Sequence, residues 1–339
     1  MIRLNLSTRL ILLTPLLLIT GTKCCAQDIP QRTDTVIEKA LIWRIEGMGL
    51  KKPSYIMGEL HTEPKEMLKH VAGWDEAFSN TEQYAFEAVG DSLKKWDKAF
   101  WRTPEAINYK KSFRPSYNYY QEVLGQKKYM EVETWIKMWG GDPYNTRPLD
   151  YIRKNINYAN VLVTLKMKHE GVQVIENDTF ITAYLYAKAL NANKKIYQLD
   201  DSNIRTQCQK AEYEITKKDI KEQIEIMYDV IRHLGTYASY IKDVDSICYY
   251  NHDINRLNEL QQRLYHNCRY FGYTDSVIVH KRNEAWIKKI PKIINKAPTL
   301  IVVGLGHLPK SNSDAGLIYR LRKMGYKVTP LNYTGNGSK

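Results

Sequence analysis

The sequence lacks several features that mark special classes of protein. After residue 20 it has no apolar run approaching the 18 or more residues that a membrane-spanning helix requires. Its 339 residues are 43% hydrophobic and 26% charged, a composition that excludes a wholly disordered or a collagen-like chain. It contains no HExxH pattern, which excludes the usual zinc-protease helix. The remaining interpretation is a globular protein of one or two domains.

Cysteine and clustered basic charge are also scarce. Beyond residue 26 only Cys208, Cys248 and Cys268 occur, with no CxxC spacing, so at most one disulfide bond is possible. A bridge from Cys248 to Cys268 and three unbridged, half-buried thiols are both compatible with this pattern. The formal charge of +13 is spread over lysine pairs, which is typical of helix surfaces and predicts no nucleic-acid partner.

Residues 1–26 have the pattern of an export signal. Arg3 and Arg9 precede an apolar stretch from Leu10 to Thr20, and small residues follow at Cys24, Cys25 and Ala26. We therefore expect cleavage near residue 26, a mature domain over residues 27–339, and a periplasmic or secreted protein. Lipid attachment at Cys24 or Cys25 is the less favoured alternative, because Lys23 and Gly21 do not suit a lipobox.

The mature chain divides into two strand-rich ends and a helical middle. Residues 36–46 and 53–58 predict a hairpin, and residues 84–89 and 299–304 predict buried strands. The region of roughly 92–293 is polar and helically periodic, apart from a short strand at residues 195–199. The predicted fold is α/β (α+β), with one central sheet and a large helical insertion.

The two ends share a pattern of strand, Gly-x-x-His, helix and strand. Gly58 leads to His61, and Gly304 leads through Gly306 to His307. The pattern predicts two related halves, with both histidines at equivalent strand ends, where open α/β sheets bind their ligands. A glycine at a strand end allows positive φ and a close backbone approach, so we expect Gly58, Gly304 and Gly306 to support these turns.

Two histidines and a carboxylate are a common set of protein ligands for a catalytic metal ion. Glu87 is the expected third ligand, because it follows the apolar strand at residues 84–89, where a lone carboxylate is costly to bury. Glu59, beside His61, is the rival ligand or the general base. The sequence thus predicts one divalent metal ion, Mn, Co, Zn or Fe, held by His61, Glu87 and His307.

Longer stretches of the chain resemble the TraB/GumN family, which includes the Tiki metalloproteases and the plasmid pheromone-shutdown proteins. The opening motif is Tyr55-Ile-Met-Gly58-Glu-Leu-His61, and the most specific block is Ile301-Val-Val-Gly304-Leu-Gly306-His307-Leu308. Further similarity covers Arg282-Asn283-Glu-Ala-Trp286, residues 316–328, residues 178–190 and residues 198–207, so that the resemblance spans nearly the whole mature chain.

The resemblance implies a sheet of two related halves with paired Gly-x-x-His motifs and, in the Tiki branch, metal-dependent peptidase activity. His61, His307 and Glu87 match the family's histidines and glutamate, and Arg282 and Asn283 match its Arg-Asn pair. In two places this chain departs from the family. Glu59 replaces a small or hydroxyl residue, and Asp200, a possible second acid, replaces the usual glutamate after the middle strand.

These observations lead to the hypothesis of an exported, metal-dependent hydrolase acting on a peptide or protein. Glu59 would move the proton and Arg282 would steady the developing oxyanion, although Arg282 is equally compatible with a carboxylate ion pair. Asn283 would orient a ligand or cap a helix. The alternatives are an envelope protein that sequesters a peptide or haem-like ligand without catalysis, and a metal-independent hydrolase similar to the erythromycin esterases. The other histidines, His70, His169, His233, His252, His266 and His280, are expected to be solvated or structural.

Overall fold

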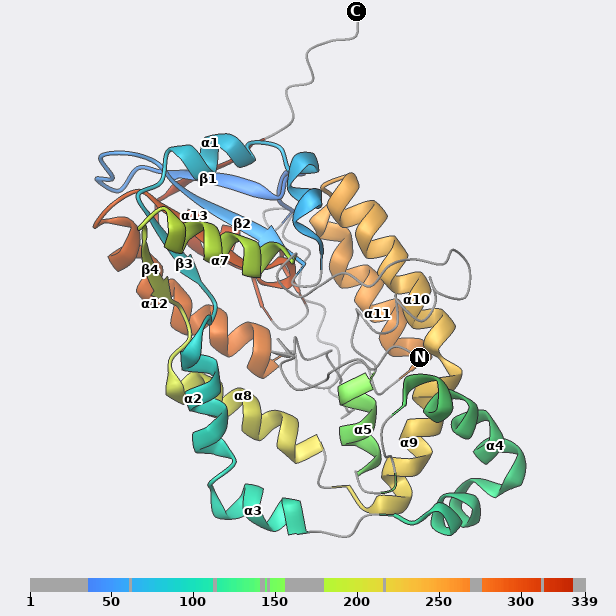
Figure 1. Ribbon diagram of the computed structural model, residues 1–339. Coiled ribbons are helices and arrows are strands. Elements are labelled where there is room, and N and C mark those ends of the chain that lie inside the picture. Colours follow the sequence, from blue (N-terminus) through green and yellow to red (C-terminus); the bar gives the residue numbers. More distant parts are fainter. Residues whose placement is uncertain are drawn as a thin grey trace, which may run out of the picture.

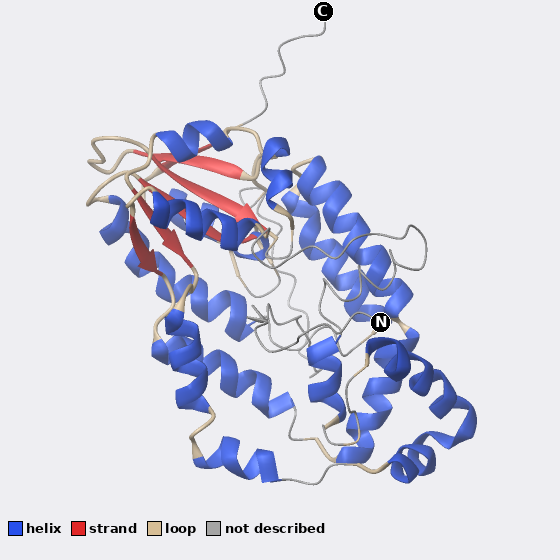
Figure 2. Cartoon of the chain, in the orientation of Figure 1, coloured by secondary structure: helices blue, strands red, loops and turns tan. Residues whose placement is uncertain are grey.

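The computed structural model describes residues 36–60, 63–111, 115–140, 144, 147–155, 180–215, 218–268, 276–311 and 314–331. Figure 1 shows one sheet with helices against it and a larger helical part beside it, and Figure 2 shows that the strands gather at one end of the molecule.

The strands are β1 (Ile42–Glu46), β2 (Ser54–Glu59), β3 (Gln83–Phe86), β4 (Lys195–Gln198), β5 (Thr299–Gly304) and β6 (Lys327–Pro330). The α-helices are α1 (Trp74–Ser79), α2 (Asp91–Phe100), α3 (Pro104–Lys111), α4 (Tyr117–Trp139), α5 (Pro148–Asn155), α7 (Ile181–Asn191), α8 (Ser202–Ile215), α9 (Ile220–Arg232), α10 (Leu234–Asp243), α11 (Leu257–Asn267), α12 (Arg282–Ile294) and α13 (Leu317–Lys323). Shorter helical turns are η3 (Lys65–His70), η5 (Val244–Tyr250), η6 (Ile254–Arg256), η8 (Ser276–Lys281) and η9 (Leu305–His307).

The sheet has the order β4-β3-β5-β2-β1-β6. Strands β2, β5, β3 and β4 are parallel neighbours, while β1 pairs antiparallel with both β2 and β6. The predicted hairpin is therefore β1–β2, closed by a turn in which the amide of Leu50 donates to the carbonyl of Gly47. The predicted α/β fold is confirmed, and the long helical stretch between β3 and β5 also contributes the edge strand β4.

The pleat of the sheet assigns side chains to two faces. The Tyr55 hydroxyl donates to Glu76 of α1, and the ring of Phe86 packs edge-on against α7, so these helices cover one face. The Gln83 amide donates to the last turn of α12, which covers the other face. Because successive residues of a strand point to opposite faces, the parity of a strand residue decides which set of helices it meets.

After Pro64, the spacing of Met67, Leu68, Val71, Trp74 and Phe78 predicts one helix, but the segment does not form a single helix. It forms the 3₁₀ turn η3 and then the separate helix α1, with Gly73 between them at a φ of 76°. A left-handed residue ends a right-handed helix, and glycine takes that conformation without the steric cost that other residues meet. The stripe of Met67, Leu68 and Val71 is nevertheless buried against the sheet.

The helical part has a core of its own. Helix α9 begins at the cap residue Asp219, whose carboxylate accepts from the amide of Glu222. The residues Ile224, Met227 and Ile231 recur at helical spacing and are buried with residues of α4, α5, α10 and α11. The sheet and its flanking helices bury a second, larger cluster. Burial of two separate apolar stripes thus stabilises the sheet layer and the helical layer.

The structure bears on two predictions, one about disulfide bonds and one about membrane-spanning helices. Cys208, Cys248 and Cys268 are buried and take part in no disulfide bond, so no bridge joins Cys248 to Cys268. Among the described helices, none combines the length and the apolar character needed to cross a bilayer. The expected export signal at residues 1–26 lies outside the described residues.

Candidate functional site

The carboxyl ends of the four parallel strands meet at one edge of the sheet. Glu59 ends β2, Gly304 ends β5, Glu87 follows β3, and Asp200 follows β4 by two residues. Backbone pairing continues past β3 and β4, since the amide of Asp200 donates to the carbonyl of Glu87. The topology therefore brings together residues that are up to 245 positions apart, at the edge where open α/β sheets bind ligands.

A buried arginine joins two carboxylates at this edge. Arg282 is the first residue of α12, and its Nη2 donates to Glu87 Oε2 at 2.6 Å and to Asp200 Oδ2 at 2.9 Å. Its Nε donates to Asp200 Oδ1 at 3.1 Å, which makes the pairing with Asp200 bidentate. The side chains of Arg282, Glu87 and Asp200 are only 9%, 11% and 1% exposed. Planar, two-point pairing of this kind is strong and geometrically specific.

The surroundings keep Arg282 charged. Burial alone lowers the pKa of Arg282, but the charges of Asp200 and Glu87 outweigh burial and raise the pKa above its ordinary value. The guanidinium also lies over the ring of Trp286, 4.4 Å from the ring centre, and the Trp286 Nε1 donates to Asp200 at 2.9 Å. Two anions and one aromatic face thus surround the cation. Of the two interpretations left open by the sequence, the carboxylate ion pair is what the structure contains.

His307 is held by Asn283. The Asn283 Nδ2 donates to the His307 carbonyl at 3.1 Å and to Asp314 Oδ1 at 2.7 Å, so that its Oδ1, 2.8 Å from His307 Nδ1, is left as an acceptor. This network assigns the proton of a neutral His307 to Nδ1 and leaves a lone pair on Nε2. The structure therefore gives Asn283 an orienting role toward the imidazole.

The Nε2 of His307 faces Glu87 and Arg282. This nitrogen lies 3.6 Å from Glu87 Oε1 and 3.4 Å from Arg282 Nη1. The same Glu87 oxygen accepts from the amide of Gly304 at 2.6 Å. Ligand atoms about 2.0 Å from a tetrahedral metal ion lie about 3.3 Å apart, so Glu87 Oε1 and His307 Nε2 suit two positions around one ion. The bond from His307 Nδ1 to Asn283 also matches the outer shell of a typical metal-binding histidine.

Asp314 contacts Asn283, the residue that orients His307, and the sequence did not indicate this role. It accepts from Asn283, from the amide of Gly316, and from the side chains of His280 and Arg320. Burial raises the pKa of Asp314, but the hydrogen bonds from Arg320 and Asn283 and the charge of Arg320 bring it below the ordinary value. The only local signal was an Asp-x-Gly sequence before a helix. His280, expected to be solvated or structural, is one of its partners.

Glu59 is buried on the other face of the sheet. The register pairs Glu59 with Gly304 and places it on the parity of Tyr55 and Phe86, which face α1 and α7. Accordingly, the hydroxyl of Thr182 on α7 donates to Glu59 Oε1 at 2.8 Å. Glu87, on the opposite parity, faces α12. The pleat thus separates the two carboxylates that the sequence treated as rivals for one position.

The supporting glycines match the expectation only in part. Their φ angles are not positive; Gly304, for example, has φ −56° and ψ 139°. Gly58 instead allows a close approach, because a Cβ there would lie 2.7 Å from a methyl carbon of Leu308 and 2.8 Å from one of Leu305. The turn that bears His307 packs directly onto β2 for this reason. A Cβ at Gly306 would make ordinary contact with a methyl carbon of Leu257 at 3.9 Å, so no close approach requires this glycine.

The predicted ligand His61 lies outside the described residues, so its position relative to Glu87 and His307 stays a prediction. Within the described part, the arrangement offers a buried carboxylate and an oriented imidazole nitrogen with a fixed cation beside them. Such a set can accept a proton from water, bind a metal ion, or hold a polar ligand.

Comparison with known proteins gives one match. Residues 41–330 match the model of the TraB/PrgY/gumN family. No curated protein and no solved structure matches the chain.

Proposed function

The chain belongs to the TraB/PrgY/gumN family, and from this membership and its site we propose that it is a hydrolase in which Glu87 and His307 activate water against a peptide or related acyl bond. The observation that carries the proposal is the 3.6 Å approach of His307 Nε2 to Glu87 Oε1 at the carboxyl edge of the sheet. The chain is further proposed to be exported, as the pattern of residues 1–26 suggests.

The roles of the residues follow from their contacts. Asn283 fixes the imidazole of His307 so that Nε2 faces Arg282 Nη1 and Glu87 Oε1, and this nitrogen is the one that would accept a proton or bind a metal ion. Arg282 pairs with Glu87 and Asp200 through its Nη2 and Nε, and its Nη1, on the His307 side, would meet negative charge that develops on the substrate. Glu59 faces α7, so the geometry favours Glu87 and His307 over Glu59 as the groups that move the proton.

A divalent ion is part of the proposal. When bound, such an ion would supply Lewis-acid activation of water and of the substrate carbonyl. Glu87 and His307 would hold it from the described part of the chain, with His61 as the third ligand expected for a catalytic site. Mn, Co, Zn and Fe are the candidates.

The test is metal content together with peptide cleavage. The protein, purified without chelator, is compared with the His61→Ala/His307→Ala double variant and with His266→Ala, whose histidine is exposed on α11. Elemental mass spectrometry is expected to show a loss of about one metal equivalent in the double variant and none in the control. Cleavage of a peptide mixture, followed by mass spectrometry, should disappear with the metal. Absence of any cleavage by metal-loaded protein would contradict the hydrolase proposal and favour the ligand-sequestering alternative.

One observation favours a second candidate, a hydrolase that works without metal. Arg282 Nη1 lies 3.4 Å from the nitrogen of His307 that would bind the ion, and a fixed cation there opposes a second one. Cleavage that survives dialysis against a chelator but is lost in His307→Ala would support this candidate over the metal-dependent one.

A further inference from the structure

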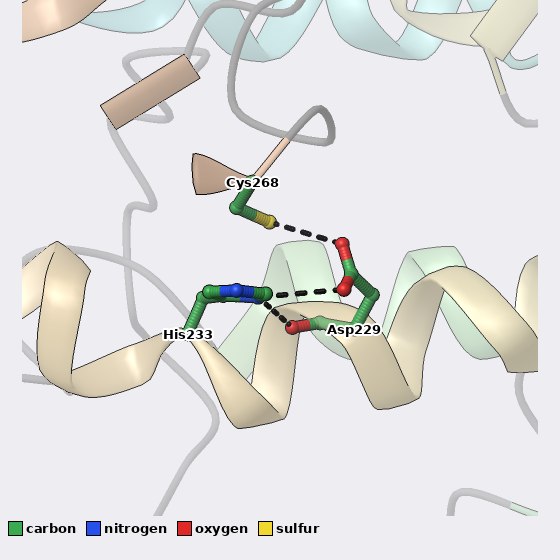
Figure 3. A group of neighbouring side chains, drawn as sticks. All are labelled: Asp229, His233 and Cys268. Atoms are coloured by element: carbon green, nitrogen blue, oxygen red, sulfur yellow. Dashed lines mark hydrogen bonds and ion pairs between the residues drawn. The ribbon is translucent and has the colours of Figure 1, made fainter. Parts of the chain in front are cut away.

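A second group of metal-binding side chains lies in the helical part, away from the sheet edge. Asp229 and His233 are four residues apart at the end of α9, and Cys268 directly follows α11 (Figure 3). One ligand atom from each of the three lies within 4.8 Å of the other two. No local pattern connects them, because Asp229 and Cys268 are 39 positions apart in the sequence.

Two of the distances are close to the edge length of a coordination tetrahedron, and they end on the two different oxygens of Asp229. Cys268 Sγ lies 3.6 Å from Asp229 Oδ2, and His233 Nδ1 lies 3.4 Å from Asp229 Oδ1. For bonds of about 2.0 Å to oxygen or nitrogen and about 2.3 Å to sulfur, tetrahedral ligand atoms lie about 3.3–3.5 Å apart. Small rotations of three side chains would therefore bring their ligand atoms around one ion.

Burial and helix ends both suit a cation at this place. Cys268 is fully buried, whereas the side chains of Asp229 and His233 are 45% and 23% exposed, so the group has a solvent side through which an ion can enter. Cys268 caps the carboxyl end of α11, and that end of a helix favours positive charge. His233 is both the residue that follows α9 and the residue that precedes α10, so the opposite dipoles of these two helix ends offset each other. The carboxyl end of α11 is therefore the helix end that favours a cation.

The alternative is a set of ordinary hydrogen bonds. His233 Nδ1 lies 2.8 Å from the carbonyl of Asp229, and the thiol of Cys268 is placed to donate to the Asp229 carboxylate. Binding of an ion would release the Cys268 thiol proton to solvent and move the ring proton of His233 from Nδ1 to Nε2. The two states differ in the ionisation of Cys268, and this difference can be measured.

From this geometry we propose a zinc-type transition-metal site formed by Asp229, His233 and Cys268, with the fourth position open to water. A thiolate, an imidazole and a carboxylate are a donor set that selects Zn²⁺ or Co²⁺ over Mg²⁺ or Ca²⁺. The ion would clip the carboxyl ends of α9 and α11 together within the apolar cluster of the helical part. The proposal does not depend on the proposed hydrolase, since none of its residues belongs to the sheet edge.

Titration of the full-length, reduced, chelator-free protein with Co²⁺ tests the site. A cysteine bound to Co²⁺ gives a thiolate-to-metal charge-transfer band in the near ultraviolet, which a centre of histidine and carboxylate ligands does not give. The band is expected in the parent protein and in His307→Ala. It should be absent in Cys268→Ser, and His233→Gln should bind Co²⁺ about tenfold more weakly or worse.

Cys208→Ser is the matched control, because Cys208 is also a buried cysteine outside any disulfide bond but lies outside the group. It should keep the band, and circular dichroism should show that each variant remains folded. A Co²⁺-loaded parent without a thiolate band would overturn the proposal. A band that persists in Cys268→Ser, or that disappears in Cys208→Ser with Cys268 intact, would do so as well. If the parent binds Co²⁺ without showing the band, the proposal is overturned and the sheet-edge centre is the site of binding.

Discussion

Removal of the buried cation at the sheet edge is expected to destabilise the protein strongly. In Arg282→Ala, Glu87 and Asp200 lose three hydrogen bonds from the guanidinium and remain buried without its charge. Truncation of one partner of a buried ion pair costs about 3–5 kcal/mol, mainly because the other charge is left uncompensated. That is a large share of the roughly 5–15 kcal/mol by which such proteins are stable.

The distances in the structure give a second, independent value for this loss of stability. One nitrogen of Arg282 lies 2.6 Å from a Glu87 oxygen and 2.9 Å from an Asp200 oxygen, so these oxygens are less than about 5.5 Å apart. Two like charges at that distance repel by about 3 kcal/mol at an effective dielectric constant of about 20. Both approaches therefore predict a loss of several kcal/mol, or a fall in the melting temperature of roughly 10 °C.

The assay is urea unfolding followed by circular dichroism at neutral pH and again near pH 4.5. Protonation of the unpaired carboxylates should shrink the deficit of Arg282→Ala at the lower pH. Neutralising all three groups in Arg282→Met/Glu87→Gln/Asp200→Asn should recover most of the loss. Lys52→Ala is the control, because Lys52 pairs with Glu82 at the surface and should lose less than about 1 kcal/mol. A deficit below about 1 kcal/mol in Arg282→Ala, or one equal at both pH values, would refute the reasoning.

Three further changes test other parts of the site by the same unfolding assay. Gly316 and Gly49 share a φ near 80°, but only at Gly316 would a Cβ overlap two backbone carbonyl oxygens. Gly316→Ala should therefore cost about 3 kcal/mol or more and Gly49→Ala about 1–2 kcal/mol; equal losses would contradict the overlap. The pKa of Asp314 is lowered in the folded state, so its stabilisation is present above its unfolded pKa and is lost as the pH falls through the folded one. Asp314→Asn should differ from the parent by a constant amount at pH 6–8 and by less below about pH 4, and a difference that grows on acidification would oppose this assignment. Thr182→Val removes the donor to buried Glu59 and should cost about 1–3 kcal/mol, whereas an unchanged midpoint would mean that Glu59 does not need this bond.

Much of the fold follows from local patterns. The near-continuous apolar run of Thr299–Gly304 indicates a strand covered on both faces, and it forms the centre of the sheet as β5. The apolar spacing of α9 and the turn between β1 and β2 were equally visible, because periodicity and turn residues act over only a few positions. Where a local pattern misled, as after Pro64, a single left-handed glycine divided the expected helix.

The candidate site was predictable only in part. Glu87 and His307 were identified by their places after apolar strands, and they do approach each other. The ion pair of Arg282 with Asp200, and the place of Asp314 behind Asn283, were not identifiable. These pairs depend on which helix covers which face, and that information is not present in any short stretch of sequence.

Short stretches of sequence identify the two Gly-x-x-His patterns, the strands that precede them, and the family to which the chain belongs. Which groups share a face depends instead on how the strands and helices pack. Strand parity directs Glu59 toward α7 and Glu87 toward Arg282, although both follow apolar strands of the same sheet. Helix packing also gathers Asp229 and Cys268 from two helix ends. The sequence specifies the chemistry of each side chain, but the distance between two side chains depends on strand order, on the pleat of the sheet and on helix packing.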